Sequence, residues 1–241
     1  MNPHSPIILI GDDTNDCFDF VEHVNMRAFE HAADSFNRQY KHRSPNDEIH
    51  ERFCFQRWFV LKEFLTQSKI DQCLHLDSDV MLYINATNER KIFSANDLTL
   101  SSGRSAHCCF ISGPNVLHAY CDMVLHTYSS QSGLQWMEKE FERINRISSG
   151  GICDMTFFEA FSQSHPGTCV ELGKIVDGAV YDDNINASDG YAMRDGIKDI
   201  RFVGRIPFSR HKESETDVQF KTLHFQGRNG KRNIGRFLQH S

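Results

Sequence analysis

The sequence has no long apolar run and no excess of basic residues. In 241 residues, no apolar stretch approaches the roughly 20 residues that a membrane-spanning helix needs. The formal net charge is −6, so electrostatics gives no reason to expect nucleic acid or an anionic membrane as the main partner. We therefore expect neither a transmembrane segment nor a nucleic-acid-binding protein.

Cysteine pairs with metal-ligand or disulfide spacing are also lacking. The eight cysteines include no C-x-x-C pair, and Cys108 and Cys109 are adjacent, which suits neither a zinc ribbon nor a compact disulfide framework. The first residues lack a basic segment, and the apolar run behind them covers only residues 7–10, so we expect no signal peptide. Together these features favour a cytoplasmic protein with mostly reduced, buried thiols.

The most informative segment that is present is residues 72–83, a short apolar run interrupted by Asp77 and Asp79. The run reads as a buried strand, and strand alternation places both carboxylates on one face. Two such charges side by side are unfavourable unless a cation joins them, and carboxylate oxygens suit Mg²⁺ and Mn²⁺, which often bring substrate phosphates. The alternative is a polar strand end that faces water.

Strand-like and helix-like segments alternate over the first two-thirds of the chain, which favours an α/β fold with a largely parallel sheet in a single domain, residues 1–241. Ligands of such sheets bind at the carboxyl ends of strands, where Asp77 and Asp79 fall. The apolar face of the second expected helix consists of Phe55, Trp58, Phe59, Leu61, Phe64 and Leu65. Expected strands lie at residues 6–10, 107–111, 200–203 and 220–225 and near Val170 and Val176, and expected helices at residues 17–40, 51–67, 115–129, 134–147 and 154–161.

A second group of residues lies near the C-terminus. His224, at the end of an expected strand, can complete an Asp/Asp/His set for Mn²⁺. Gly227 and Gly230 would let the backbone approach a ligand closely, and Lys231 can place positive charge against a diphosphate. The alternative is a basic, glycine-rich end that is simply solvated.

Residues 57–62 (RWFVLK), 76–79 (LDSD) and 223–227 (LHFQG), with Lys231 behind them, together resemble a GT-A-type nucleotide-sugar glycosyltransferase. The resemblance implies a GT-A fold, a nucleotide-sugar donor, UDP being the commonest, and a saccharide or other hydroxyl acceptor. It implies Mn²⁺ or Mg²⁺ as cofactor. The donor side would be about residues 1–112 and the acceptor side about residues 113–241.

The resemblance also assigns roles to single residues. The metal ligands would be Asp77, Asp79 and His224, with Asp79 the more direct one and Asp77 shared with the ribose. The residues implied around the nucleotide-sugar are Arg57, Asp77, Ser78, Gly227 and Lys231.

Residues 150–156 (GGICDMT) resemble the segment that places an acidic residue beside the acceptor, which makes Asp154 the candidate for acceptor binding or catalytic base. A helix N-cap explains Asp154 equally well. His107 is a weaker candidate, for the acceptor cleft, because a histidine at a strand start is more often structural. The loop residues Asp182, Asp183 and Asn184 are candidates for contacts with sugar hydroxyls, but such loops are often solvated turns.

One departure from the family pattern is the short stretch before residues 6–10. Family members begin with a further strand and helix that hold the base, so we expect this first unit to be lacking and the sheet to have an exposed edge. Two alternatives stay open: a haloacid dehalogenase-like phosphatase, which uses the first Asp of its Asp-x-Asp as nucleophile, and a non-catalytic nucleotide- or sugar-binding remnant.

Overall fold

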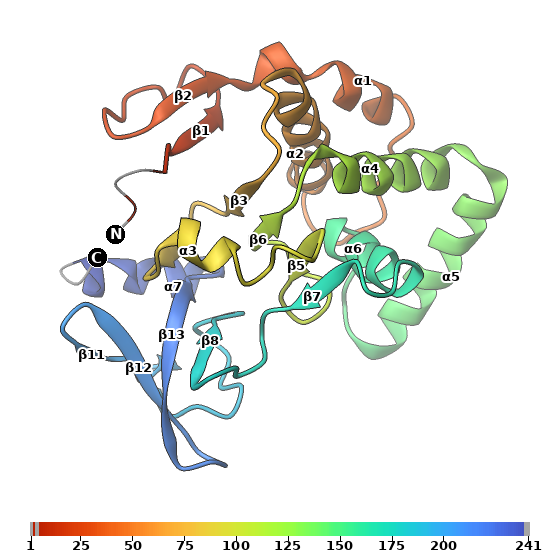
Figure 1. Cartoon of the computed structure of the whole chain (residues 1–241). Coiled ribbons are helices and arrows are strands. Elements are labelled where there is room, and N and C mark those ends of the chain that lie inside the picture. Colours follow the sequence, from red (N-terminus) through yellow and green to blue (C-terminus); the bar gives the residue numbers. More distant parts are fainter. Residues whose placement is uncertain (1, 3–4, 239–241) are drawn as a thin grey trace. The chain divides into compact units, whose positions relative to one another are not determined.

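The computed structural model describes residues 2 and 5–238, which form a mixed α/β protein (Figure 1). The described residues divide into two compact units. The helical unit comprises residues 5–73 and 111–168, and the sheet unit comprises Asn2 and residues 74–110 and 169–238. Both units draw on both halves of the sequence.

The helical unit contains two short strands and most of the long helices. Its elements are β1 (Ile8–Gly11), β2 (Glu22–Asn25), the 3₁₀ helix η1 (Met26–Phe29), α1 (His31–Asn37), α2 (Glu48–Gln67), α4 (Pro114–Ser129), α5 (Gln131–Ile147) and α6 (Asp154–Ser164). Among its described residues, no helix is both long enough and apolar enough to cross a lipid bilayer, and the same holds for the sheet unit.

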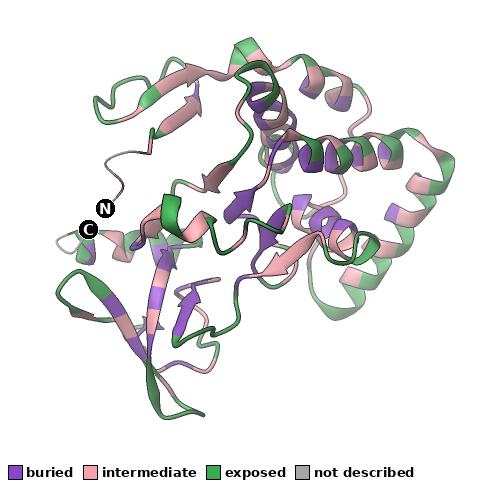
Figure 2. Ribbon diagram, viewed as in Figure 1, coloured by how far each residue is buried: buried purple, intermediate pink, exposed green. Residues whose placement is uncertain are grey.

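The helix α2 confirms its predicted apolar face. The Asp47 side chain accepts a hydrogen bond from the backbone N–H of His50 and thereby caps the helix at its N-terminus. All six apolar residues expected on the face are buried (Figure 2). The ring of Phe36 from α1 stacks on Phe59 at 5.1 Å, so aromatic packing fixes α1 against α2.

The single helix expected over residues 17–40 is wrong in its first half. Residues 22–25 form β2, which pairs in parallel with β1. The Asn25 side chain then caps η1 by accepting from the N–H of Arg27, so a new helical segment begins there. Long-range pairing with β1 overrides the local pattern, and regular α-helix is confined to α1.

The sheet unit holds the other strands and the short C-terminal helices. Its elements are β3 (Cys73–Leu76), β4 (Val80–Leu82), α3 (Ala86–Arg90), β5 (Leu98–Leu100), β6 (Cys108–Ile111), β7 (Cys169–Glu171), β8 (Ala179–Tyr181), β9 (Met193–Arg194), β10 (Ile197–Lys198), β11 (Arg201–Val203), β12 (Ile206–His211), β13 (Thr216–His224), α7 (Gly227–Asn233) and the 3₁₀ helix η2 (Ile234–Arg236).

The strand β13 organises this unit. It pairs antiparallel with β12 and β4 and parallel with β8, in a five-stranded sheet in which β11 lies beyond β12. A separate four-stranded sheet has the order β3-β6-β5-β7. The expectation of a mostly parallel sheet is therefore wrong around β13, because residues 201–224 return through tight hairpins, as at Gly204 with its φ of 61°.

The core of the sheet unit follows from alternation along β13. Val218 and Phe220 point to the buried face, and Leu223 and Phe225 continue the apolar packing at the end of the strand. Phe237 from the C-terminal segment packs against Phe225 with ring centroids 5.1 Å apart. This packing holds the C-terminal end of β13, where His224 lies, in a fixed place.

Candidate functional site

Strand pairing brings the Asp-x-Asp segment and His224 together. In the antiparallel register of β4 and β13, His224 lies opposite Val80, the residue that follows Asp79. The N–H of Phe225 donates to the carbonyl of Asp79 at 2.8 Å and extends the ladder by one step. Two segments that are far apart in the sequence are thus locked side by side by backbone hydrogen bonds.

The Asp-x-Asp segment is a turn and not part of a strand. The strand β3 ends at Leu76, and the N–H of Val80 donates to the carbonyl of Asp77 at 3.1 Å, which closes a tight turn over residues 77–80. The prediction that strand alternation places Asp77 and Asp79 on one face is therefore wrong. The turn itself now fixes where each carboxylate lies.

Asp79 carries the closest charged contacts of the segment. Its carboxylate lies 3.2 Å from Lys231 Nζ and 3.6 Å from His224 Nε2, and its side chain is 14% exposed. Burial raises the pKa of Asp79, but the hydrogen bonds and charges of His224 and Lys231 lower it by more, so that the pKa is about 2. Asp79 is therefore ionised at neutral pH and faces the ammonium group of Lys231 and the ring of His224.

His224 presents one defined nitrogen to Asp79. Its Nδ1 lies 2.6 Å from the carbonyl oxygen of Asp183, and since a carbonyl can only accept, Nδ1 carries a proton. Burial lowers the pKa of His224, whereas Asp79 and this carbonyl raise it more, so that the pKa lies above its usual value. A backbone carbonyl that fixes one ring nitrogen of a histidine is the arrangement that metal-ligating histidines use.

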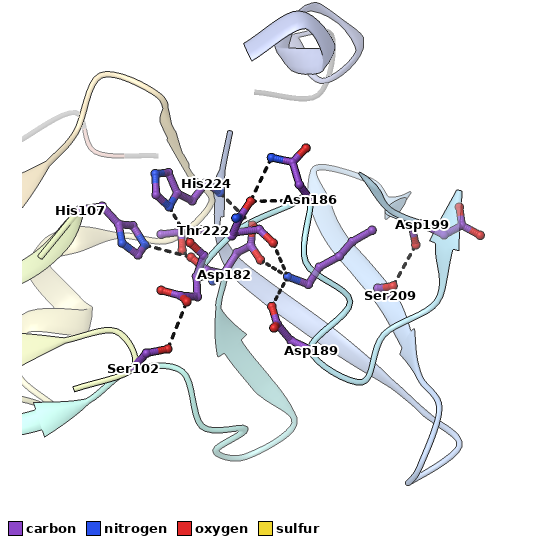
Figure 3. A network of polar contacts seen from close by, with 12 residues as sticks. Ser102, His107, Asp182, Asn186, Asp189, Asp199, Ser209, Thr222 and His224 are labelled. Atoms are coloured by element: carbon purple, nitrogen blue, oxygen red, sulfur yellow. Dashed lines mark hydrogen bonds and ion pairs between the residues drawn. The ribbon is translucent and has the colours of Figure 1, made fainter. Parts of the chain in front are cut away.

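The ring of His107 stacks face to face on the ring of His224. The two rings stack with centroids 3.9 Å apart and planes 15° apart (Figure 3). Nε2 of His107 donates to the carbonyl of Asp182, and Nδ1 accepts from the hydroxyl of Ser105. Burial and the neighbouring His224 lower the pKa of His107 to about 4, so the ring is neutral at pH 7 and forms a wall of the site.

Three further residues predicted near the nucleotide-sugar, Asp77, Ser78 and Gly227, lie in the same turn or at the start of α7. Asp77 Oδ1 lies 3.8 Å from His75 Nε2, and Ser78 is exposed at the tip of the turn. Gly227 begins α7 with a φ of +67°, which favours glycine. Their roles toward a donor stay predictions.

Gly230 is required by packing within the protein. A Cβ atom at this position would lie 2.5 Å from the carbonyl carbon of Phe225, so only glycine lets α7 lie against the end of β13. This close approach places the next residue, Lys231, beside Asp79. The predicted approach to a ligand at Gly230 is, in the structure, an approach to the backbone of Phe225.

The variant Gly230→Ala should lower the free energy of unfolding by about 1–3 kcal/mol, as is typical of overpacking, because α7 must move away from Phe225. The measurement is urea unfolding, with Gly235→Ala as the matched control. A Cβ at Gly235 meets nothing within 4 Å, so this control should stay within about 0.5 kcal/mol of the wild type. Equal effects of the two variants would contradict the packing argument.

Arg57 and Asp154 belong to the helical unit and contact each other. Arg57 Nη2 donates to Asp154 Oδ2 at 2.8 Å, and the buried indole N–H of Trp58 donates to the same oxygen at 3.0 Å. Asp154 Oδ1 accepts from the N–H of Met155, and the residue is buried. Asp154 is the first residue of α6, with Cys153 at the N-cap, so the expected capping position is off by one residue. Its catalytic role stays a prediction beside this structural one.

The predicted metal set is only partly assembled. Asp79 and His224 are adjacent, but among residues 2 and 5–238 no group of three or more His, Cys, Asp or Glu side chains is arranged to hold a metal ion. A carboxylate and an imidazole fit Mn²⁺, and hard divalent ions often complete their shells with substrate phosphates and water. The residues present therefore fit a metal that arrives with a diphosphate better than an all-protein cage.

Sequence reasoning missed the two most buried charged residues near His224. The sequence singles out Asp182 only as a loop residue for contacts with sugar hydroxyls, and it gives no reason to select Lys198. Both side chains are at most 1% exposed and form an ion pair at 2.7 Å. No local pattern around residues 182 and 198 indicates this pair, because the chain brings the two together only when β8, β10 and β13 assemble.

Comparison of the chain with protein-family models, with curated proteins and with solved structures found no match.

Proposed function

We propose that this chain is a metal-dependent GT-A-type glycosyltransferase that moves a sugar from a nucleoside-diphosphate donor, UDP-sugar in the simplest case, to a hydroxyl acceptor. The observation that carries the proposal is the convergence of Asp79, His224 and Lys231 at one end of the β4–β13 pair. A carboxylate and an imidazole are suited to a divalent cation, and a lysine is suited to a phosphate. The GT-A topology and the cytoplasmic setting belong to this proposal.

Each residue then has a role that its position supports. Mn²⁺ or Mg²⁺, when bound, would neutralise the charge that develops on the departing diphosphate. Asp79 and His224 Nε2 would hold the ion, and Asp77 would complete the set by a movement of the turn at residues 77–80. Lys231, whose side chain is 60% exposed, has room to leave Asp79 and contact the diphosphate. The carbonyl of Asp183 would keep Nε2 of His224 directed at the ion.

The first test is a thermal-melt panel of the wild-type protein with UDP, GDP and CDP, each with and without Mn²⁺. We expect one nucleotide to raise Tm by about 5–10 °C at about 100 times its Kd, and only when Mn²⁺ is present. Mn²⁺ alone and the matching nucleoside monophosphate are the controls. A cooperative melt that no diphosphate shifts would contradict the proposal.

Turnover separates the proposal from its alternatives. We expect metal-dependent release of the nucleoside diphosphate from its sugar conjugate in the presence of a hydroxyl acceptor. Binding of the diphosphate without any release would favour the non-catalytic remnant. Phosphate release from a generic phosphomonoester, with no response to nucleotides, would favour the phosphatase.

A further inference from the structure

Lys198 is buried inside the sheet unit and uses its whole hydrogen-bonding capacity. Its side chain is 1% exposed, and Nζ donates to Asp182 Oδ1 at 2.7 Å, to Asp189 Oδ2 at 2.6 Å and to the carbonyl of Asn184 at 2.7 Å. An ammonium group has three N–H donors, and each has an acceptor here. Lys198 thus fixes three points of the segment of residues 182–189.

Asp182 is the residue through which this clamp reaches the end of β13. Its carboxylate is fully buried, and while Oδ1 accepts from Lys198, Oδ2 accepts from the backbone N–H of His224 at 3.0 Å. The backbone of Asp182 donates to Thr222 Oγ1 and accepts from Nε2 of His107. Figure 3 shows Asp182 between His107, Thr222 and His224, at the centre of these contacts.

The next residue of the same segment sets the direction of the His224 ring. The carbonyl of Asp183 accepts from Nδ1, which leaves Nε2 on the side of Asp79. The backbone of His224 is therefore held by Asp182 and its ring by Asp183. Since these residues are neighbours, anything that loosens residues 182–183 loosens both contacts together.

We infer that Asp182, held in place by Lys198, is a positioning residue that fixes His224 with Nε2 directed at the cation site. The identity of the cation rests on the proposed function, whereas the orientation of the ring rests on the geometry alone. A buried ion pair is not by itself a source of stability, because desolvation offsets its attraction. The contact of Asp182 with His224 accounts for this buried pair, whereas a gain in stability does not.

The decisive variant is Asp182→Asn. Asparagine replaces one of the two carboxylate oxygens by an NH₂ donor, so the side chain can no longer offer one oxygen to Lys198 Nζ and the other to the N–H of His224. We expect the affinity for Mn²⁺, measured by electron paramagnetic resonance without nucleotide, to fall about 10-fold, at the low end of the effect of removing a histidine ring partner, because Asp182 holds the backbone of His224 and the neighbouring Asp183 holds its ring. In the metal-free protein, the ¹⁵N spectrum of the neutral His224 ring should show less of the form protonated at Nδ1.

Lys221→Met is the matched control. Lys221 also lies on β13, three residues before His224, and its ammonium group forms an ion pair with Glu89 that touches neither Asp182 nor His224. This variant should lower Tm but leave the Mn²⁺ affinity within about twofold and the His224 ring spectrum unchanged. An equal loss of Mn²⁺ affinity in both variants would show a general effect of instability and overturn the inference.

A second variant keeps the inference testable if Asp182→Asn does not fold. Asp189→Asn removes the negative charge of a half-exposed partner of Lys198, so it should shift the His224 ring spectrum in the same direction by a smaller amount. If the wild-type protein binds no Mn²⁺, the metal role in the proposed function fails, and the ring spectrum alone decides the positioning role. Folded Asp182→Asn or Asp189→Asn protein with an unchanged ring spectrum would overturn it.

Discussion

In the variant Asp79→Asn, the Mn²⁺-dependent affinity for a nucleoside diphosphate should fall at least about 100-fold, or about 2.7 kcal/mol. The substitution keeps the shape of the side chain but removes the anion that faces His224 Nε2 and Lys231 Nζ. The ammonium group of Lys231 would then remain, without its carboxylate partner, beside the place where a divalent cation must bind. The measurement is isothermal titration with the nucleotide identified in the melt panel, with and without Mn²⁺.

Asp217→Asn is a suitable control for this experiment. Asp217 belongs to the same strand as His224 but pairs with Arg201 at a position where both side chains are at least 40% exposed. Exposed ion pairs contribute little, so this variant should bind Mn²⁺ and diphosphate as the wild type does. Diphosphate binding that is unchanged in Asp79→Asn would show that Asp79 is not part of the site.

The same carboxylate gives the metal-free protein a defined dependence on pH. The pKa of Asp79 is lowered to about 2 from 3.8, so the unfolded state binds more protons and stability rises with pH over this interval. In the presence of a chelator, the ion pairs of Asp79 should add on the order of 2 kcal/mol above pH 3.8, and this is lost as the pH falls through about 2. The difference in unfolding free energy between wild type and Asp79→Asn should therefore vanish at the acid end.

Some of the fold was readable from local patterns. The aromatic periodicity of residues 51–67 predicted the buried face of α2, because a helix buries residues by their spacing alone. The region of residues 17–40 failed for the opposite reason, since β2 exists only through its pairing with β1. The hairpins formed by β11, β12 and β13 are likewise not predicted by local patterns, because they depend on pairing between these strands.

In the candidate site, too, some residues could be predicted from local motifs and others could not. Asp79, His224 and Lys231 were selected for their residue types and resemblance to a motif, and the structure brings these three together. Strand alternation does not explain where the carboxylates of Asp77 and Asp79 lie, because the N–H of Val80 donates to the carbonyl of Asp77 and closes a turn. Lys198 and Asp182 carry no motif, and only the assembled strands show that they lie behind His224.

Replacing Asp154 by alanine should destabilise the protein by about 3–5 kcal/mol, as is typical when one partner of a buried ion pair is removed. The Arg57 guanidinium and the buried indole N–H of Trp58 both lose the oxygen to which they donate. For a chain of this length the corresponding fall in Tm is about 6–20 °C, which a thermal melt without ligand measures directly. A loss of this size would show that Asp154 holds α2 to α6 through Arg57 and Trp58.

A purely catalytic base would show the reverse pattern, with Tm unchanged and turnover lost. Glu138→Ala provides the control in the same unit, since Glu138 pairs with Arg43 while its side chain is 52% exposed, and it should change stability by no more than about 1 kcal/mol. Asp154→Asn keeps one acceptor oxygen and should lie between the wild type and Asp154→Ala. If Asp154→Ala has the same Tm as the wild type, Asp154 does not hold α2 to α6 as its contacts indicate. If Asp79→Asn has also lost diphosphate binding, a role of Asp154 on the acceptor side of the reaction is then the one to test.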